Sequence, residues 1–331
     1  MAALSDEEYF QWLYRVESDD TYLKEMGDAA LTADKLYEAA KSEGANLTLD
    51  FVRETADPER SFEGKFIRYL REMTLGLLGA RAEHVKHTRV FYLPCHSLNG
   101  FASMTPNGTT FIVLNQEVIP LLGLYTVMFE SFISWHEAKP FCRDHTQGDF
   151  VHAIVQLAHY ASTRNSGYMA GVKALHCPSI PTWEPRTYTL AVIIELLIVL
   201  HEFGHIILGH LGSAQHQIVR LLDGSTLDSL RQSRVQEFEA DAFAFTTFRD
   251  RKARDSMTPQ DVAYDFGLLL KFFDLCFRLH PPVIPECEWT HPHPADRWKS
   301  IQNLANLKDF PRCRAYHLDS AFEAIYRTAG V

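Results

Sequence analysis

The chain has 331 residues, of which 46% are hydrophobic and 22% are charged. This length and composition are typical of a soluble globular protein with one large domain or two ordinary ones. The formal net charge of −10 and the isoelectric point near 5.9 argue against nucleic acid as the main partner, because phosphate binding favours a basic face.

Neither a secretion signal nor a lipid-facing helix is expected. The first residues, MAALSDEEYFQ, are acidic and lack the basic start and apolar block of a secretory signal. The six cysteines are scattered without a C-x-x-C pair, which indicates reduced thiols rather than a disulfide scaffold or a zinc ribbon. Residues 190–211 have the length of a membrane span, but Glu195, Glu202 and three histidines make them too polar to face lipid. We therefore expect a cytoplasmic protein without a transmembrane segment.

Residues 1–60 are predicted to form a small helical domain. Ser5 and Glu8 fit a capping box, and a second helix near residues 31–42 ends before Gly44. The stretches LSDEEYFQWLYRVESDDTYLKEM and AAKSEGANLTLDFVRE resemble the leader-peptide domain of the nitrogen-fixation and nitrile-hydratase type, found on precursors of ribosomally made natural products. The resemblance implies a partner in such a pathway; the alternative is an ordinary helical N-terminal extension.

Residues 61–331 are predicted to form one α+β domain that is mainly α and has a small β-sheet. We expect an amphipathic helix over residues 61–84, followed by two β-prone runs, TRVFYLP and LNGFASMTPNGTTFIVLN. The Pro-Asn-Gly within the second run is a hairpin signal. Residues 117–183 are expected to be mostly helical.

The segment HEFGH, at residues 201–205, places two histidines and a glutamate in an otherwise apolar helix. His201 and His205 are four residues apart, so their imidazoles lie one turn apart on the same face and can both reach one zinc ion. Glu202 follows the first histidine, as a general base does in the H-E-x-x-H pattern. A metal would offset the cost of burying these groups; the alternative is two histidines with ordinary core hydrogen bonds.

A later helix, RVQEFEADAFAFTTF, is predicted to complete the site. Glu237 and Asp241 share one face at i, i+4, whereas Glu239 points elsewhere. We expect Glu237 to be the third zinc ligand and Asp241 to accept the remaining N–H of a ligating histidine. The alternative is a solvated acidic face. His210, nine residues after His201, is expected to be structural or to act behind a ligand.

HEFGHIILGH and EFEADAFA together resemble the gluzincin metallopeptidases of the CAAX prenyl protease and HtpX type. The resemblance implies a zincin-like fold whose zinc site is completed by Glu237, the first glutamate of E-x-x-A-D. LNGFASMTPNGTTFIVLN is similar to the family's N-A-F-A strand and hairpin, and THPHPADRW to its late H-P-x-x-x-R element. It therefore implies a catalytic role for His293 and substrate-binding roles for Asn99, Gly100, Phe101, Ala102 and Arg297.

The resemblance is incomplete in three respects. Gly100 stands where the family has alanine, the spacing from N-G-F-A to the zinc helix is longer than expected, and the family's transmembrane helices are not evident. The histidine-rich, E-x-E-A-D-x-F-A pattern also resembles the ImmA/IrrE-type peptidases, but that family does not account for THPHPADRW.

The function expected is that of a soluble zinc endopeptidase acting on a peptide or protein. Glu202 would take the proton of the attacking water, and His291, His293 or Arg297 would supply a donor to the oxyanion. The strand at residues 109–114 would bind the substrate backbone by strand addition. The leader-like segment suggests a maturation protease for a ribosomally made peptide. The alternative function is a metal-containing regulatory or peptide-binding protein without turnover.

Overall fold

The structure is a computed structural model and describes fourteen stretches of the chain. These are residues 5–6, 62–93, 100–105, 107–115, 118–136, 145–163, 166–169, 172, 185–213, 215–220, 226–231, 233–252, 257–281 and 291–331. Apart from Ser5 and Asp6, the helical domain expected over residues 1–60 lies outside them, as does Asn99.

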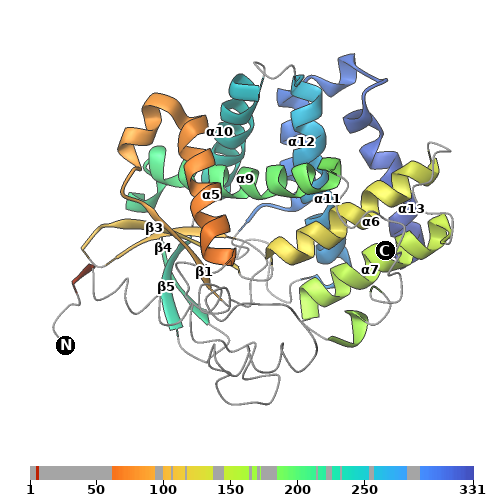
Figure 1. Ribbon diagram of the computed structural model, residues 1–331, viewed down its shortest axis with the longest axis horizontal. Helices are drawn as coiled ribbons and strands as arrows, with labels where there is room; N and C mark the ends of the chain where they lie inside the picture. The colour runs from red at the N-terminus through yellow and green to blue at the C-terminus, as the bar shows by residue number, and fades with distance from the viewer. Residues whose placement is uncertain are drawn as a thin grey trace, which may run out of the picture. The chain divides into compact units, whose positions relative to one another are not determined.

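The chain divides into two compact units, and the chain passes between them more than once. One unit comprises Met1–Gln116 and Ala214–Arg231, and the other comprises Glu117–Ser213 and Gln232–Val331. The first holds the described β-strands, and the second holds most of the described helices (Figure 1). The protein is thus mainly helical with a small mixed sheet, which confirms the expectation of an α+β, mainly α chain.

The first unit has one long described helix and a three-stranded sheet. Helix α5 (Phe62–Leu78) packs beside β1 (Arg89–Leu93). The sheet order is β1-β3-β2, with β3 (Thr110–Asn115) parallel to β1 and antiparallel to β2 (Phe101–Met104). The β2–β3 pairing confirms the hairpin predicted from Pro-Asn-Gly.

The turn of this hairpin is held by a residue far away in the sequence. Gly108 has a φ of +90°, a left-handed value that glycine adopts without strain. The carboxylate of Asp6 accepts hydrogen bonds from the side chains of Thr105, at 2.5 Å, and of Asn107, at 3.1 Å, and from the Thr109 hydroxyl. Asp6 is therefore tied to the tip of the hairpin.

A second hairpin in this unit was not predicted. Strands β4 (Gln215–Arg220) and β5 (Thr226–Arg231) pair antiparallel, and β5 lies beside β2. In the sequence this hairpin stands between the two helices that carry the candidate metal ligands.

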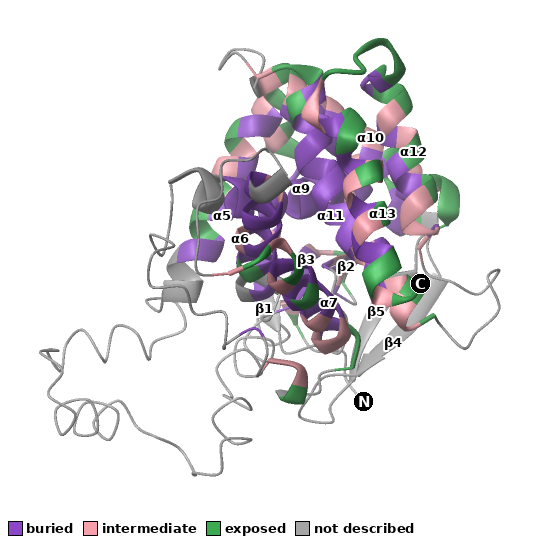
Figure 2. Ribbon diagram, turned by 90° about the vertical axis from the view of Figure 1, so that its right-hand side faces the viewer, coloured by how far each residue is buried: buried purple, intermediate pink, exposed green. Residues whose placement is uncertain are grey.

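The described part of the second unit contains seven α-helices, besides shorter 3-10 helices. They are α6 (Val118–His136), α7 (Gln147–Thr163), α9 (Pro185–Ile207), α10 (Arg234–Lys252), α11 (Pro259–Leu279), α12 (Pro294–Leu304) and α13 (Leu318–Ala329). Helix α9 packs against α6, α10 and α11. Figure 2 shows α9 and α11 largely in the buried colour, so these two helices form the core of the unit.

Helix α9 is apolar enough to be mistaken for a membrane span. Its segment Leu190–Ile207 is the one described stretch with the length and hydropathy to cross a bilayer, yet 83% of it is buried inside the protein. A helix that is hydrophobic all round and surrounded by other helices is typical of a protein core.

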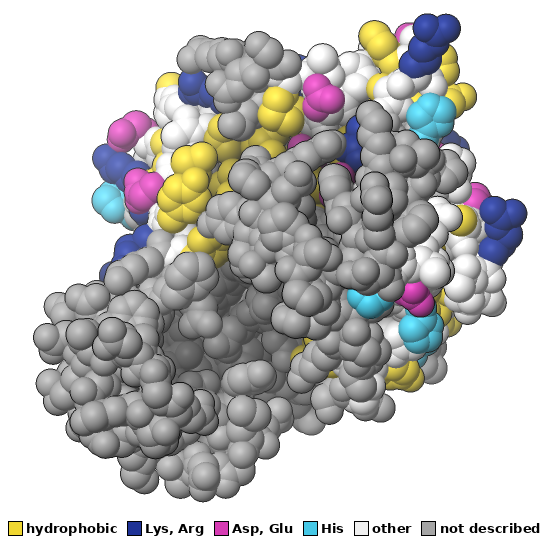
Figure 3. All heavy atoms as spheres, turned by 45° about the vertical axis from the view of Figure 1, so that its right-hand side comes forward, with side chains coloured by type: hydrophobic (Ala, Val, Ile, Leu, Met, Phe, Trp, Pro, Cys, Tyr) yellow, Lys and Arg dark blue, Asp and Glu magenta, His cyan; other side chains and the backbone are white. Residues whose placement is uncertain are grey.

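On the face drawn in Figure 3, the coloured basic and acidic side chains are interspersed.

Candidate metal centre

Helix α9 presents two histidines side by side. The Nε2 atoms of His201 and His205 are 3.1 Å apart, and the two residues are 6% and 2% exposed. Their i, i+4 spacing places both rings on one face of the helix, as the sequence predicted. Glu202, the next residue after His201, is also buried, at 4% exposure.

Helix α10 brings the carboxylate of Glu237 to this pair. The helix begins with a capping box, in which the Ser233 hydroxyl accepts from the Gln236 N–H and the Gln236 side chain accepts from the Ser233 N–H. Glu237 follows in the first turn. Its Oε2 is 3.3 Å from His201 Nε2, and its Oε1 is 3.5 Å from His205 Nε2.

These three residues, called the metal group below, have the spacing of ligands around one ion. Each offers one ligand atom, and these atoms all lie within 4.8 Å of one another. Bonds of about 2.0–2.1 Å to a tetrahedral ion would place ligand atoms about 3.3 Å apart. The two Nε2 atoms are 3.1 Å apart, and each lies 3.3 or 3.5 Å from one of the two Glu237 oxygens, which is close to that value.

The environment of the Glu237 carboxylate favours binding of a cation. The residue is fully buried, and among the described residues no hydrogen bond is aligned on either of its oxygens. Burial raises the pKa of this carboxyl, but the neighbouring His291 and His201 hold it well below its usual value. A buried, ionised carboxylate without aligned donors is costly unless a cation meets it. The metal group could therefore bind a metal ion.

The close approach of α9 and α10 depends on Gly204. A Cβ built at this position would lie 3.1 Å from Cδ1 of Phe243 and 3.3 Å from the Cα of Ala240. These contacts are tight, and the second is with backbone, which cannot rotate away. Gly204 lies between the two histidines in the sequence, so the absence of its side chain allows α10 to carry Glu237 up to them.

Behind His201 lies a buried ion pair. Asp241 accepts from His201 Nδ1 at 2.9 Å and from Nε and Nη2 of Arg297 at 2.7 and 2.6 Å. Burial lowers the pKa of His201, but the contacts with Asp241 and Glu237 outweigh it and raise that pKa to about 10. Burial raises the pKa of Asp241, but Arg297 and His201 hold it at about 2. Because a carboxylate only accepts, His201 Nδ1 donates, and Nε2 faces the metal group.

Behind His205 lies a second histidine. Gly209, with a φ of +74°, ends the helix and turns the chain into the short 3-10 helix His210–Ser213. This turn brings Nδ1 of His210 to 3.0 Å from Nδ1 of His205. Nε2 of His210 is in turn 3.1 Å from Oε2 of Glu239. The prediction that His210 is structural or acts behind a ligand fits this position, whereas no sequence pattern selects Glu239.

The three candidate oxyanion donors occupy different places. Nδ1 of His291 is 2.8 Å from Oε2 of Glu237, so His291 lies at the metal group with its side chain 31% exposed. Arg297 is buried against Asp241. His293 is the N-cap of α12, where its Nδ1 accepts from the Ala295 N–H at 3.2 Å. The assignment of His293 as a catalytic residue stays a prediction.

The residues expected to bind substrate belong to the first unit. Gly100 is buried, and Phe101 and Ala102 begin β2, with Ala102 only 2% exposed. Their part in substrate binding stays a prediction.

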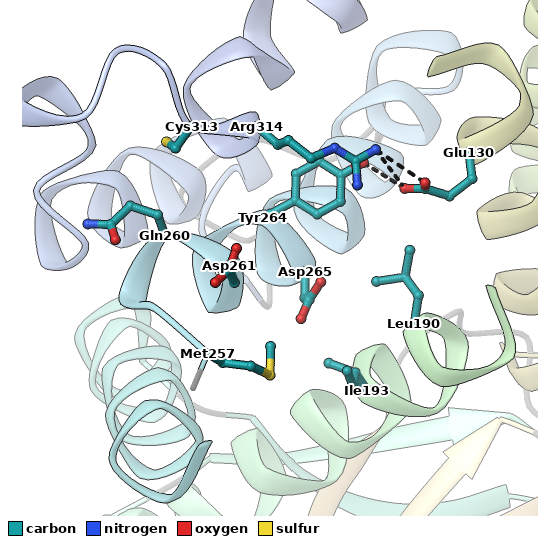
Figure 4. A pocket seen from close by; sticks show the side chains of 10 residues that line it. All are labelled: Glu130, Leu190, Ile193, Met257, Gln260, Asp261, Tyr264, Asp265, Cys313 and Arg314. Carbon is teal, nitrogen blue, oxygen red and sulfur yellow. Dashed lines mark hydrogen bonds and ion pairs between the residues drawn. The ribbon is translucent and has the colours of Figure 1, made fainter. Parts of the chain in front are cut away.

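The second unit also contains a pocket of about 340 Å³ (Figure 4). The Tyr264 hydroxyl donates to Glu130 at 2.7 Å, and Nη2 of Arg314 lies 3.2 Å from the same carboxylate. The guanidinium also lies 4.5 Å from the centre of the Tyr264 ring. The charge of Glu130 is thus met by a tyrosine hydroxyl and a guanidinium of the protein. The pocket is lined by Glu130, Leu190, Ile193, Met257, Gln260, Asp261, Tyr264, Asp265, Cys313 and Arg314.

Comparisons of the chain with protein-family models, with curated proteins and with solved structures returned no match. The interpretation of the metal group therefore depends on its own geometry and chemistry.

Proposed function

We propose that this protein is a zinc-dependent endopeptidase of the gluzincin type, with a zincin-like fold, acting in the cytoplasm. The observation that supports the proposal most is the buried group of two imidazoles and one carboxylate, with Glu202 beside the first histidine on the same helix. The resemblance of HEFGHIILGH and EFEADAFA to that family agrees with this arrangement.

The ligand atoms of the metal group favour zinc in a catalytic role. Two imidazole nitrogens and one carboxylate oxygen are donors that zinc accepts, and three protein ligands leave a fourth position open, as in catalytic sites. When bound, zinc would lower the pKa of a coordinated water toward neutrality and polarise the carbonyl to be cleaved. The nitrogen-rich ligand set argues against magnesium and calcium, which prefer oxygen.

Glu202 is the residue that we propose moves the proton. Its carboxylate would take a proton from the water as the water oxygen bonds to the peptide carbonyl carbon. It would then deliver that proton to the amine nitrogen as the carbon–nitrogen bond breaks. Its burial supports this role, because a site that excludes bulk water keeps the transferred proton between the attacking water, Glu202 and the leaving amine.

His291 is the oxyanion donor that the geometry favours. Its ring contacts Glu237 and is partly open to solvent, so a substrate can reach it. Arg297 is buried, and its Nε and Nη2 are engaged by Asp241. An imidazole N–H directed at the carbonyl oxygen would stabilise the negative charge that develops there.

The test separates metal binding from turnover. We expect the purified protein to contain about one zinc per chain by metal analysis and to cleave peptides in a chelator-sensitive way. Glu202→Gln should keep the zinc and lose at least about 100-fold in activity, since general base catalysis contributes about 10²–10⁴-fold. Glu323→Gln, at an exposed glutamate of α13, is the matched control and should change neither. Bound zinc without any cleavage that depends on Glu202 would contradict the peptidase and favour the regulatory or peptide-binding protein.

The substrate class that we propose is the precursor of a ribosomally made peptide. The support is the resemblance of the N-terminal segment to a leader-peptide domain, which lies outside the described residues apart from Ser5 and Asp6. This segment would dock a partner of the pathway. The check is mass mapping of candidate precursor peptides after incubation with the full chain and with a chain lacking residues 1–56. Equal cleavage of every precursor by both would contradict this role.

A further inference from the structure

A chain of hydrogen-bonding groups leads from the metal group to the surface through His205, His210 and Glu239. The two Nδ1 atoms of the histidines are 3.0 Å apart, and Nε2 of His210 is 3.1 Å from Oε2 of Glu239. The exposure of the side chains rises along this chain from 2% to 6% to 55%. The outermost member is therefore in contact with water, and the innermost is in the core.

The carboxylate of Glu239, the outermost member, determines which atom donates in each hydrogen bond of this chain. An ionised carboxylate can only accept, so Nε2 of His210 must carry the proton that it donates to Glu239. In a neutral imidazole the other nitrogen is then an acceptor, so Nδ1 of His210 accepts from Nδ1 of His205. With its proton on Nδ1, His205 directs the lone pair of Nε2 at the metal group.

We infer that His210 and Glu239 are positioning residues that fix the tautomer and ring orientation of the metal ligand His205. This inference concerns metal binding and does not require that the protein is a peptidase. A ligating imidazole is held in most metal sites by a partner on its other nitrogen. For His201 that partner is the buried Asp241, whereas for His205 it is a histidine whose own partner lies at the surface.

The position of His210 is itself fixed by the backbone around it. Gly209 turns the chain back toward α9, and the Gln236 side-chain amide donates to the carbonyl oxygen of His210 at 3.4 Å. Because Gln236 belongs to the capping box of α10, the residue behind His205 and the helix that carries Glu237 are tied together.

The first experiment reads the tautomer directly. In protein labelled with ¹⁵N-histidine and loaded with zinc, we expect His210 to be neutral, with its proton on Nε2 and Nδ1 accepting, and His205 to be protonated on Nδ1. A proton on Nδ1 of His210 would overturn the inference, because that nitrogen could not then accept from His205. The same spectrum of a Glu239→Lys protein should show a larger population with the proton on Nδ1.

The second experiment measures zinc affinity by competition with a chelator. His210→Ala should weaken binding about 10–100-fold, the usual effect of losing an outer partner of a ligand. His210→Asn should stay within roughly threefold of the wild type, because its amide oxygen replaces Nδ1 as the acceptor. Equal weakening by Ala and Asn, or no weakening by Ala, would overturn the inference.

The charge at the outer end is tested with a matched pair of variants. Glu239→Lys replaces an acceptor by a donor and should weaken zinc binding, whereas Asp250→Lys, an exposed charge reversal on the same helix, should not. Equal affinities of these two variants would overturn the part assigned to Glu239. Since both readouts are made without substrate, a failure of the proposed peptidase activity would be recognised separately.

Discussion

Arg297 and Asp241 form a two-armed ion pair in the interior of the second unit, with Nε–Oδ2 and Nη2–Oδ1 distances of 2.7 and 2.6 Å. Arg297 is 7% exposed and Asp241 is fully buried. Removing one partner of a buried pair leaves the other charge uncompensated, at a cost of about 3–5 kcal/mol.

Arg297→Ala should therefore lower the free energy of unfolding by about 3 kcal/mol or more, measured by urea denaturation with chelator present. Arg234→Ala is the matched control, because Arg234 lies 3.8 Å from Asp296 in an exposed pair. Its effect should be below about 1 kcal/mol. Similar losses in the two variants would contradict the burial and pairing of Arg297.

A second prediction concerns the contact between α9 and α10. Gly204→Leu should lower both the unfolding free energy and the zinc affinity, because a side chain there meets the backbone of Ala240 and separates Glu237 from the histidines. Gly123→Ala in α6 is the control, since nothing lies within 4 Å of a Cβ at that position. That variant should gain up to about 1 kcal/mol from helix propensity. A Gly204→Leu protein with unchanged zinc affinity would contradict the proposed approach of the helices.

A third prediction concerns the effect of the metal on stability. A ligand that binds only the folded state adds about 2.7 kcal/mol when its free concentration is 100 times its dissociation constant. Zinc should therefore raise the melting temperature of the wild type, and a chelator should reverse the increase. Glu237→Gln should lose most of this increment, because an amide replaces the anionic ligand. The exposed control Glu323→Gln should keep it, and equal increments in the two variants would argue against Glu237 as a ligand.

A fourth prediction concerns the pH dependence of stability. Glu195 of α9 is 3% exposed, and burial raises the pKa of its carboxyl to about 8. Between the unfolded value of 4.5 and about 8, the folded state keeps a proton that the unfolded state releases, so stability falls as the pH rises through this window. At pH 7 the loss is on the order of 3 kcal/mol.

The measurement for Glu195 is the difference in unfolding free energy between Glu195→Gln and the wild type across pH 5–8. The amide does not titrate, so the variant should gain on the wild type steadily as the pH rises. A difference that does not change with pH would show that Glu195 titrates normally. Taking the difference removes contributions from the histidines, which are common to both proteins.

The sequence predicted those parts of the candidate site that depend on helical periodicity. The spacing of His201 and His205 places them on one face of α9, and Glu237 and Asp241 recur at the same spacing on α10. Local periodicity determines such pairs whatever the rest of the fold does. The mainly helical class follows from the same periodicity, whereas the β2–β3 hairpin was predicted from a local turn signal, Pro-Asn-Gly.

The other contacts depend on where the chain goes between the helices. His210 reaches His205 through the turn at Gly209, and Glu239 reaches His210 from another helix, although it lies on a different side of α10 from Glu237. His291 precedes α12 in a stretch without periodicity. No local pattern predicts such contacts. The β4–β5 hairpin did carry one signal, the Asp-Gly pair at residues 223–224, which favours a tight turn.

The insertion of β4–β5 between α9 and α10 has a consequence for how the protein is dissected and assembled. Helices α9 and α10, which carry the metal group, follow one another in the second unit, but the chain between them forms β4 and β5 in the first unit. A truncation that removes residues 1–116 would therefore leave β5 without its neighbour β2. The second unit is built from two separated stretches of chain, so the residues of the metal group come together only after the segment between them has closed into a loop. Neither unit can be excised as a single continuous segment.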